Sequence, residues 1–272
     1  STLGSDNGIG CSYMIALISE GYDGEFLFTS DEEIGLIGAN NLALRLNASY
    51  MLNLDREEEG EICIGCAGGV DIFGTNSNKK IIPNTDNLDL YEITIGKLQG
   101  GHSGVDIDKN IPNGIKLIVK TIKECKGKLL DINGGERINS IPVNVKAIIA
   151  TNKTPQASHE NMIINKIDTK SEHLYIYDDK IIDFIYNFQN GVRTKNQELS
   201  VVQTSINLAI IKTGIDEIKI ELSGRSMDNE DLKNLKDETI EMLKNYNFEV
   251  TTNGKYPAWK PDINEFTSKV LE

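Results

Sequence analysis

The sequence predicts an α/β protein in two parts: a first part with a mostly parallel sheet flanked by helices, and a second, α+β part of two similar halves. Three observations predict this. Short apolar segments alternate with helical patterns up to residue 85, longer alternating segments begin near residue 86, and a round of strands and one helix recurs after residue 198. Short strands separated by helices are typical of parallel sheets.

The first part contains four predicted elements. The patterns indicate a helix at residues 12–18, a short buried strand at 25–30, an amphipathic helix at 34–46 and a strand at 50–54. Ligands of open parallel sheets bind beyond the carboxyl ends of the strands. We therefore expect the acidic residues that follow the two strands to meet at one edge of the sheet.

The second part contains two rounds of longer strands. The first round has strands at 88–97 and 143–151, with a helix at 111–125 between them. The second has strands at 199–213, 217–223 and 248–252, and a helix at 227–245 that begins with an acidic turn. These patterns divide the chain into residues 1–85, 86–255 and 256–272.

Composition excludes several classes of protein. The 272 residues include 28 Lys and Arg against 41 Asp and Glu, a net charge of −13, which argues against nucleic acid or an anionic membrane as the main partner. No apolar stretch approaches the roughly 20 residues that span a bilayer, and no basic leader is present. We expect a cytoplasmic enzyme.

The four cysteines are too few to form a disulfide scaffold in a chain of this length. Cys63 and Cys66 have the spacing of a metal-binding or redox pair, but no second pair or nearby histidine accompanies them. Residues 61–67 have the pattern of a buried strand, so we expect these cysteines to serve packing.

Acidic residues gather at three places in the first part: Asp6 in a Gly-rich turn, the run Asp31-Glu32-Glu33, and Asp55. Clustered carboxylates repel one another unless a cation lies between them, so the pattern indicates a metal ion. Carboxylates alone suit Mg²⁺ or Ca²⁺ as well as Zn²⁺. The other interpretation is an ordinary acidic first turn of a helix.

Seven ordered motifs resemble those of the aminoacyl-histidine (Xaa-His, PepD-type) dipeptidases, co-catalytic zinc peptidases related to carnosinase and the glutamate carboxypeptidases. The resemblance runs along the whole chain and implies a partial zinc-peptidase catalytic domain with an inserted lid domain at 86–255, after which residues 256–272 return to the catalytic domain. The motifs are Thr2-Leu-Gly-Ser-Asp-Asn-Gly-Ile-Gly10, Phe28-Thr-Ser-Asp-Glu-Glu-Ile-Gly35, Leu52-Asn-Leu-Asp-Arg-Glu-Glu-Glu-Gly-Glu61, Gly65-Cys-Ala-Gly-Gly69, Gly100-Gly-His-Ser-Gly104, Arg137-Ile-Asn-Ser-Ile-Pro142 and Gly224-Arg-Ser-Met-Asp228.

The resemblance assigns metal chemistry to the acidic residues. Asp6 corresponds to a carboxylate that bridges two zinc ions, with Co or Mn as alternatives, and Glu33 and Asp55 each correspond to a ligand of one ion. Glu32 corresponds to the general base. Two metal ions can share a water molecule and lower its pKa, while an unligated glutamate takes up its proton.

In the second part the resemblance assigns contacts with a dipeptide substrate. His102 corresponds to a lid histidine that stabilises the tetrahedral oxyanion, and Asn139 and Arg225 correspond to residues that hold the substrate. Arg225 is expected to pair with the terminal carboxylate through its planar two-donor fork. Without the resemblance, we would interpret these residues as a surface or core histidine, a turn residue and a surface charge.

The chain departs from the family pattern in its histidines. A His-x-Asp motif before Asp6 and a metal-binding histidine near the carboxyl end are both missing. We therefore expect an inner slice of the catalytic domain, weak zinc binding and little or no dipeptidase activity. Alternative functions are an aminoacylase or tripeptidase of the same fold, and a metal-free binding or assembly module. A homodimer could form through the lid domain.

Overall fold

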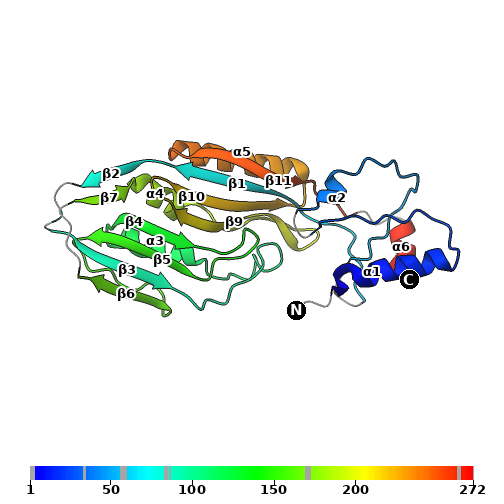
Figure 1. The fold of residues 1–272 in the computed structure, drawn as a ribbon, viewed down its shortest axis with the longest axis horizontal. Helices are drawn as coiled ribbons and strands as arrows, with labels where there is room; N and C mark the ends of the chain where they lie inside the picture. Colours follow the sequence, from blue (N-terminus) through cyan, green and yellow to red (C-terminus); the bar gives the residue numbers. More distant parts are fainter. Residues whose placement is uncertain are drawn as a thin grey trace. The chain divides into compact units, whose positions relative to one another are not determined.

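The computed structural model describes residues 4–32, 35–55, 60–82, 85, 87–168, 173–261 and 265–271. The chain divides into two compact units, one of residues 1–63 and one of residues 64–270, with Leu271 assigned to the first. Figure 1 gives the elements in sequence colours. No helix in the described part of the chain has the length and apolar character needed to cross a membrane.

The first unit contains two helices, α1 (Ser5–Ser19) and α2 (Ile37–Asn40). The helix predicted at 12–18 is confirmed within α1, whereas the helix predicted at 34–46 is wrong, because only the four residues of α2 are helical. The strands predicted at 25–30 and 50–54 are also wrong: residues 4–32 and 35–55 contain no strand.

Strands fail to form in the first unit because backbone N–H and C=O groups of a strand need a neighbouring strand as partner. Its apolar side chains also stay in solvent: Phe28 is 47 % exposed, Leu44 69 % and Leu52 64 %. The parallel sheet expected for this part is therefore not formed in the described residues. The acidic residues that follow residues 25–30 and 50–54 are therefore not brought together at the edge of a sheet, as was expected.

The second unit is built on a nine-stranded sheet whose described strand pairs are all antiparallel (Figure 1). Its order is β11-β1-β10-β9-β4-β5-β3-β6, and β8 pairs with β9. A two-stranded sheet pairs β2 with β7. The strands are β1 (Gly68–Asn76), β2 (Lys79–Ile82), β3 (Asp89–Ile95), β4 (Lys128–Gly134), β5 (Val145–Thr151), β6 (Met162–Ile167), β7 (Leu174–Tyr177), β8 (Gly191–Asn196), β9 (Val201–Thr213), β10 (Ile218–Ser226) and β11 (Glu249–Tyr256).

The mixed α/β class is confirmed, and the predicted elements of the second part are found. Strands β3, β5, β9, β10 and β11 lie where alternation predicted them, as do helices α3 (Gly114–Glu124) and α5 (Asn229–Asn245). One set of strands, β3 to β6, accompanies α3, and another, β1 with β9 to β11, accompanies α5. The two sets meet where β4 pairs with β9. The domain boundary expected at residue 85 stays a prediction, although β1 already belongs to this sheet.

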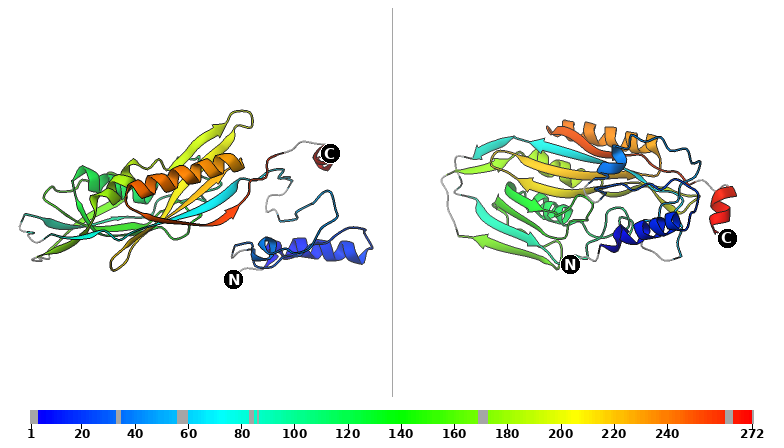
Figure 2. Two further views of the ribbon diagram at one scale, coloured as in Figure 1. Left: turned by 90° about the horizontal axis from the view of Figure 1, so that it is seen from above. Right: turned by 45° about the vertical axis from the view of Figure 1, so that its right-hand side comes forward.

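Three helices cover one face of the sheet, α3, α5 and α4 (Asp179–Asn187), as Figure 2 shows. A short helix, α6 (Glu265–Leu271), follows residue 264. Each covering helix is preceded by a residue whose side chain accepts hydrogen bonds from backbone N–H groups of the first turn: Asn113 for α3, Asp178 for α4 and Asp228 for α5. Such caps satisfy donors that have no partner within the helix.

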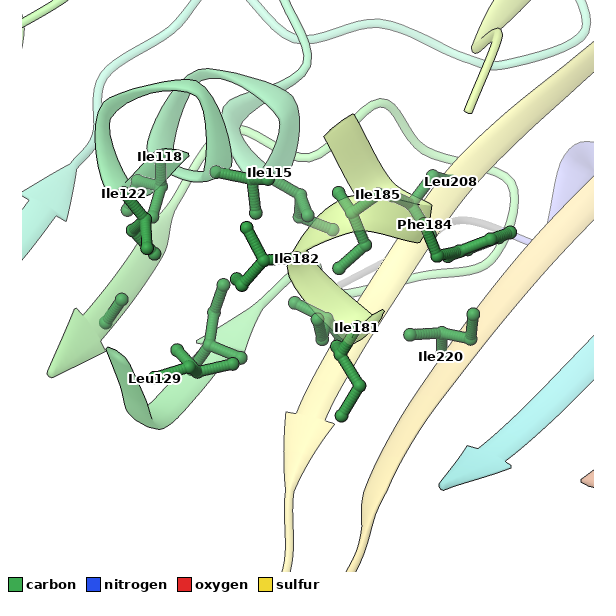
Figure 3. Close-up of a cluster of buried hydrophobic side chains, with 14 of the residues drawn as sticks. Ile115, Ile118, Ile122, Leu129, Ile181, Ile182, Phe184, Ile185, Leu208 and Ile220 are labelled. Atoms are coloured by element: carbon green, nitrogen blue, oxygen red, sulfur yellow. The ribbon is translucent and has the colours of Figure 1, made fainter. Parts of the chain in front are cut away.

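The core of the second unit lies between the helices and the sheet and is rich in isoleucine. Figure 3 shows how α3 and α4 place their apolar side chains against each other and against the strands. Ile115, Ile118, Ile181 and Phe184 are fully buried. Each buried side chain of this size contributes about 1.5–3 kcal/mol. The face of the sheet that the helices cover therefore stabilises the unit, and polar residues can lie on the opposite face of the sheet.

Candidate functional site

His102 lies in the loop between β3 and α3, where backbone hydrogen bonds fix its position. Its N–H donates to Asp106 Oδ2 at 2.7 Å, and it forms an antiparallel bridge with Ser140. Next to it, Ser103 N donates to the carbonyl oxygen of Asn139 at 2.8 Å. The loop carrying His102 and the loop carrying Asn139 are thereby joined.

The His102 ring is held neutral and in one tautomer. Its pKa is lowered by burial and, to a smaller extent, by the positive charge of Arg225, while Asp106 acts in the opposite direction. Gly104 N donates to Nδ1 at 3.2 Å, so the neutral ring carries its proton on Nε2. A neutral imidazole with Nε2–H can donate a hydrogen bond to an oxyanion.

Arg225 reaches the same place from β10. Its neighbour Gly224 packs against Leu235 of α5, so by alternation along the strand Arg225 belongs to the face opposite that helix. A Cβ built on Gly104 would come within 2.9 Å of the Arg225 guanidinium and 3.0 Å of His102 Cε1. The glycine after Ser103 therefore leaves room for arginine and histidine to lie together.

Asn139 adjoins this pair. Its side chain is exposed, and its carbonyl oxygen holds Ser103, as described above. The next residue, Ser140, accepts a hydrogen bond from Nδ2 of Asn207 at 2.7 Å. His102, Asn139 and Arg225, which were predicted from separate motifs, thus belong to one polar cluster in the second unit.

Sequence reasoning missed other members of this cluster. Among the described residues, buried side-chain atoms without a hydrogen-bond partner occur at Ser103 Oγ, Asn207 Oδ1 and Arg225 Nε, all in or beside it. Buried polar groups are normally paired, and exceptions of this kind are common at functional sites. Asn207 had a visible signal, because it is a polar residue between two apolar residues, Ile206 and Leu208.

Sequence reasoning also missed Asp71, on the neighbouring strand β1, and Tyr256, on β11 beyond it, which lie on the side of Arg225 toward that edge of the sheet. The pKa of Asp71 is raised by burial, against the opposing effects of a hydrogen bond from Ser223 and the charge of Arg225. The pKa of Tyr256 is also raised by burial, against the charge of Arg225 and a hydrogen bond with it. Arg225 is therefore the positive centre of a partly buried network.

The predicted metal ligands are placed differently. Asp6, Glu32 and Asp55 are exposed in the first unit, and Glu33 lies outside the described residues. Within the described ranges, no three His, Cys, Asp or Glu side chains form a group that could hold a metal ion. The described carboxylates therefore do not fit a zinc centre as they are placed. Cys63 and Cys66 are exposed, so the buried strand expected at residues 61–67 is wrong.

A wide groove of about 870 Å³ lies elsewhere on the second unit, between the β8 segment and α5. Its lining includes Arg193, Gln203, Asp231 and Glu238, and the described lining residues include none of the predicted site residues. Size alone therefore does not identify the functional site here, and the polar cluster around His102 remains the better candidate.

No protein-family model matches the chain. The cytosol non-specific dipeptidase of Escherichia coli (strain K12) is 30% identical over 301 residues, which cover 97% of this chain and 61% of that protein. The crystal structure of aminoacylhistidine dipeptidase from Vibrio alginolyticus matches with a TM-score of 0.80 at 25% identity, over 98% of this chain and 61% of that one. Aminopeptidase PepT from Bacillus cereus matches with a TM-score of only 0.40 at 17% identity, over 98% and 53%.

The chain therefore spans about three fifths of the length of these two dipeptidases. Both matches cover nearly all of its own residues. The chain is accordingly similar over nearly all of its length to two dipeptidases, one of them an aminoacylhistidine dipeptidase, which is the resemblance that its motifs predicted.

Proposed function

We propose that this chain is the substrate-binding part, and a portion of the catalytic part, of a peptidase that hydrolyses the peptide bond of Xaa-His or similar dipeptides. The observation that carries the proposal is the meeting of His102 and Arg225 beside Gly104, from segments more than 120 residues apart. The dipeptidases similar to this chain support the reaction class.

The chemistry of the cluster suits a dipeptide. The Arg225 guanidinium offers a charged donor fork for the terminal carboxylate. The Nε2–H group of neutral His102 can donate to the oxygen of the scissile carbonyl as negative charge develops there. Asn139, whose side chain is exposed beside them, supplies a further amide for the peptide backbone.

The metal assignment is part of the proposal and rests on the resemblance. Asp6, Glu33 and Asp55 are proposed as ligands of two zinc ions, and Glu32 as the general base. Bound zinc would lower the pKa of a water molecule and polarise the carbonyl. Because the described carboxylates form no metal-binding group, we derive no step of the reaction through them.

Two further proposals concern the setting of the protein. The Escherichia coli relative is a cytosol non-specific dipeptidase, which supports a cytoplasmic location here. A homodimer through the second unit is proposed from the resemblance and is tested by light scattering of the purified chain.

Dipeptide binding tests the function. We expect the chain to bind β-Ala-His or Gly-His, and to bind the same dipeptide with an amidated carboxyl end roughly tenfold more weakly, because a charge-assisted pair with Arg225 is lost. Arg225→Ala should remove this difference. Arg193→Ala is the matched control, since Arg193 pairs with Glu238 outside the cluster. Equal binding of both peptides by the wild type would contradict the proposal.

Hydrolysis separates the enzyme classes. With zinc supplied, turnover of Xaa-His dipeptides but not of acetyl-amino acids supports a dipeptidase, and the reverse supports an aminoacylase. Metal analysis of a protein that spans the whole length of the related dipeptidases distinguishes either enzyme from a metal-free assembly module.

A further inference from the structure

Two segments about 190 residues apart in the sequence lie side by side in the second unit, residues 65–69 and residues 256–261. Cys66 N donates to the Trp259 carbonyl at 2.8 Å, and Trp259 N donates to the Cys66 carbonyl at 2.9 Å. A Cβ on Gly65 would lie 2.7 Å from Pro261, and one on Gly68 would lie 2.5 Å from Ala258 N. The glycines therefore permit an approach that side chains would block.

The third glycine of this segment, Gly69, leaves space on the sheet surface between the strand of Tyr256 and the strand of Arg225. In the strand register Gly69 pairs with Tyr256 of β11 on one side and with Arg225 of β10 on the other. A Cβ on Gly69 would lie 2.5 Å from both Cζ and the hydroxyl oxygen of Tyr256. The end of the tyrosine side chain therefore lies on the glycine backbone, between its own strand and the strand of Arg225.

We propose that Tyr256 is a positioning residue, whose hydroxyl is carried over Gly69 to hold the Arg225 guanidinium beside His102, where it receives the substrate carboxylate. The proposal rests on the proposed function for the role of Arg225, and it adds the residue that fixes that arginine. It also explains why residues 65–69 and 256–261 lie side by side. The glycines of the first segment allow the second segment, which begins with Tyr256, to pack directly against it.

The chemistry of a phenol suits this task. Burial raises the pKa of Tyr256, so its hydroxyl stays protonated and uncharged and, in the proposed arrangement, accepts a hydrogen bond from the guanidinium. An uncharged acceptor fixes the orientation of Arg225 without neutralising it. Tyr256 therefore adds no negative charge beside Arg225 to that of Asp71, and the guanidinium can still attract an incoming anion.

Tyr256→Phe tests the proposal, because it removes only the hydroxyl. We expect the Arg225 guanidinium to leave its place, so the titration midpoint of His102, followed by NMR, should rise toward its ordinary value of 6.5. The affinity for Gly-His should fall roughly tenfold, and the affinity for the amidated peptide should stay unchanged. Asp106, which also acts on His102, keeps its contacts in this variant.

Tyr177→Phe is the matched control. Its hydroxyl is also hydrogen-bonded, to the carbonyl oxygens of Gly214 and Glu217 at 3.1 Å, but lies outside the polar cluster. This variant should lower the midpoint of thermal unfolding and leave both the His102 titration and the peptide affinity unchanged. The comparison separates positioning of Arg225 from general loss of a buried hydroxyl.

Gly69→Ala provides a second route to the same effect, because its methyl group takes the place of the tyrosine hydroxyl. It should reproduce both changes, and the double variant with Tyr256→Phe should add nothing further. Gly74→Ala, in the same strand but against the core side chains Ile220 and Phe248, is its control. A folded Tyr256→Phe with an unchanged His102 midpoint and peptide affinity would overturn the inference. If the wild type binds no dipeptide, the proposed function fails by itself, and the His102 midpoint alone then decides whether Tyr256 holds Arg225.

Discussion

Replacing Lys116 by methionine should destabilise the second unit, because this lysine joins α3 to the end of α4. Its Nζ donates to the carbonyl oxygens of Ile185, Tyr186 and Phe188 at 2.6, 2.8 and 2.7 Å. These carbonyls belong to the last turn of α4, where no helical N–H can pair with them. Methionine keeps the apolar stem and removes only the ammonium group.

The expected loss follows from the contacts. The bonds to Ile185 and Phe188 are partly buried, but the Phe188 carbonyl keeps a second donor, Asn190 N at 3.0 Å, so only the Ile185 acceptor loses its partner inside the protein. A buried acceptor left unpaired costs about 1–3 kcal/mol, so we expect the free energy of unfolding to fall by about that amount, measured by urea denaturation with circular dichroism. Lys120→Met, at an exposed position of the same helix, is the control and should change it by less than about 0.5 kcal/mol.

The pH dependence provides a second measurement. Burial lowers the pKa of Lys116 from 10.5 to about 8. The unfolded chain therefore binds more protons than the folded chain between these two values, so this group makes stability rise with pH across that window. Lys116→Met has no such titration, so the gap between wild type and variant should widen above about pH 8. A loss no larger than that of Lys120→Met, or a gap that narrows in this window, would refute the reasoning.

Three other predictions follow from the core and the cluster. Phe184→Ala should lower the free energy of unfolding by about 3–5 kcal/mol, because the ring is fully buried. It contacts the rings of Phe188, Tyr246 and Phe248. A loss below about 1 kcal/mol would contradict its place in the core. Ser103→Ala should leave thermal stability unchanged or raise it, because its hydroxyl makes no hydrogen bond, while dipeptide affinity falls; lower stability with intact affinity would argue for a structural role. Asp106→Asn should lower the NMR titration midpoint of His102 further below 6.5, since the carboxylate now raises the pKa of that ring; a rise would show that the sign is wrong.

Local patterns predicted five strands and two helices of the second unit, because these elements pack around one core, but they missed β1, β2, β4, β6, β7, β8 and α4. The helix at 111–125 and the strands at 143–151 and 199–213 each carry the period of their own element, and each finds neighbours that bury its apolar face. The same reasoning failed at 25–30 and 50–54. Apolar runs of this kind become strands only when other strands pair with them.

The site was predicted in part, since the motifs identified His102, Asn139 and Arg225 but not the residues that position them. Tyr256 lies next to Arg225 because two strand registers align both with Gly69, and no spacing along the sequence reveals a register. Asn207 is recognisable as a polar residue between Ile206 and Leu208, but its contact with Ser140 depends on where a distant loop lies against the strand.

The sequence by itself determined the acidic charge, five strands and two helices of the second unit, and the resemblance to dipeptidases, because composition, periodicity and motifs are local properties of the chain. Only the tertiary structure decided that burial lowers the pKa of His102, that Arg225 lies beside it, and that the Tyr256 side chain lies on Gly69, between its own strand and that of Arg225. These properties depend on burial and on contacts between distant segments, which arise only when the sheet assembles.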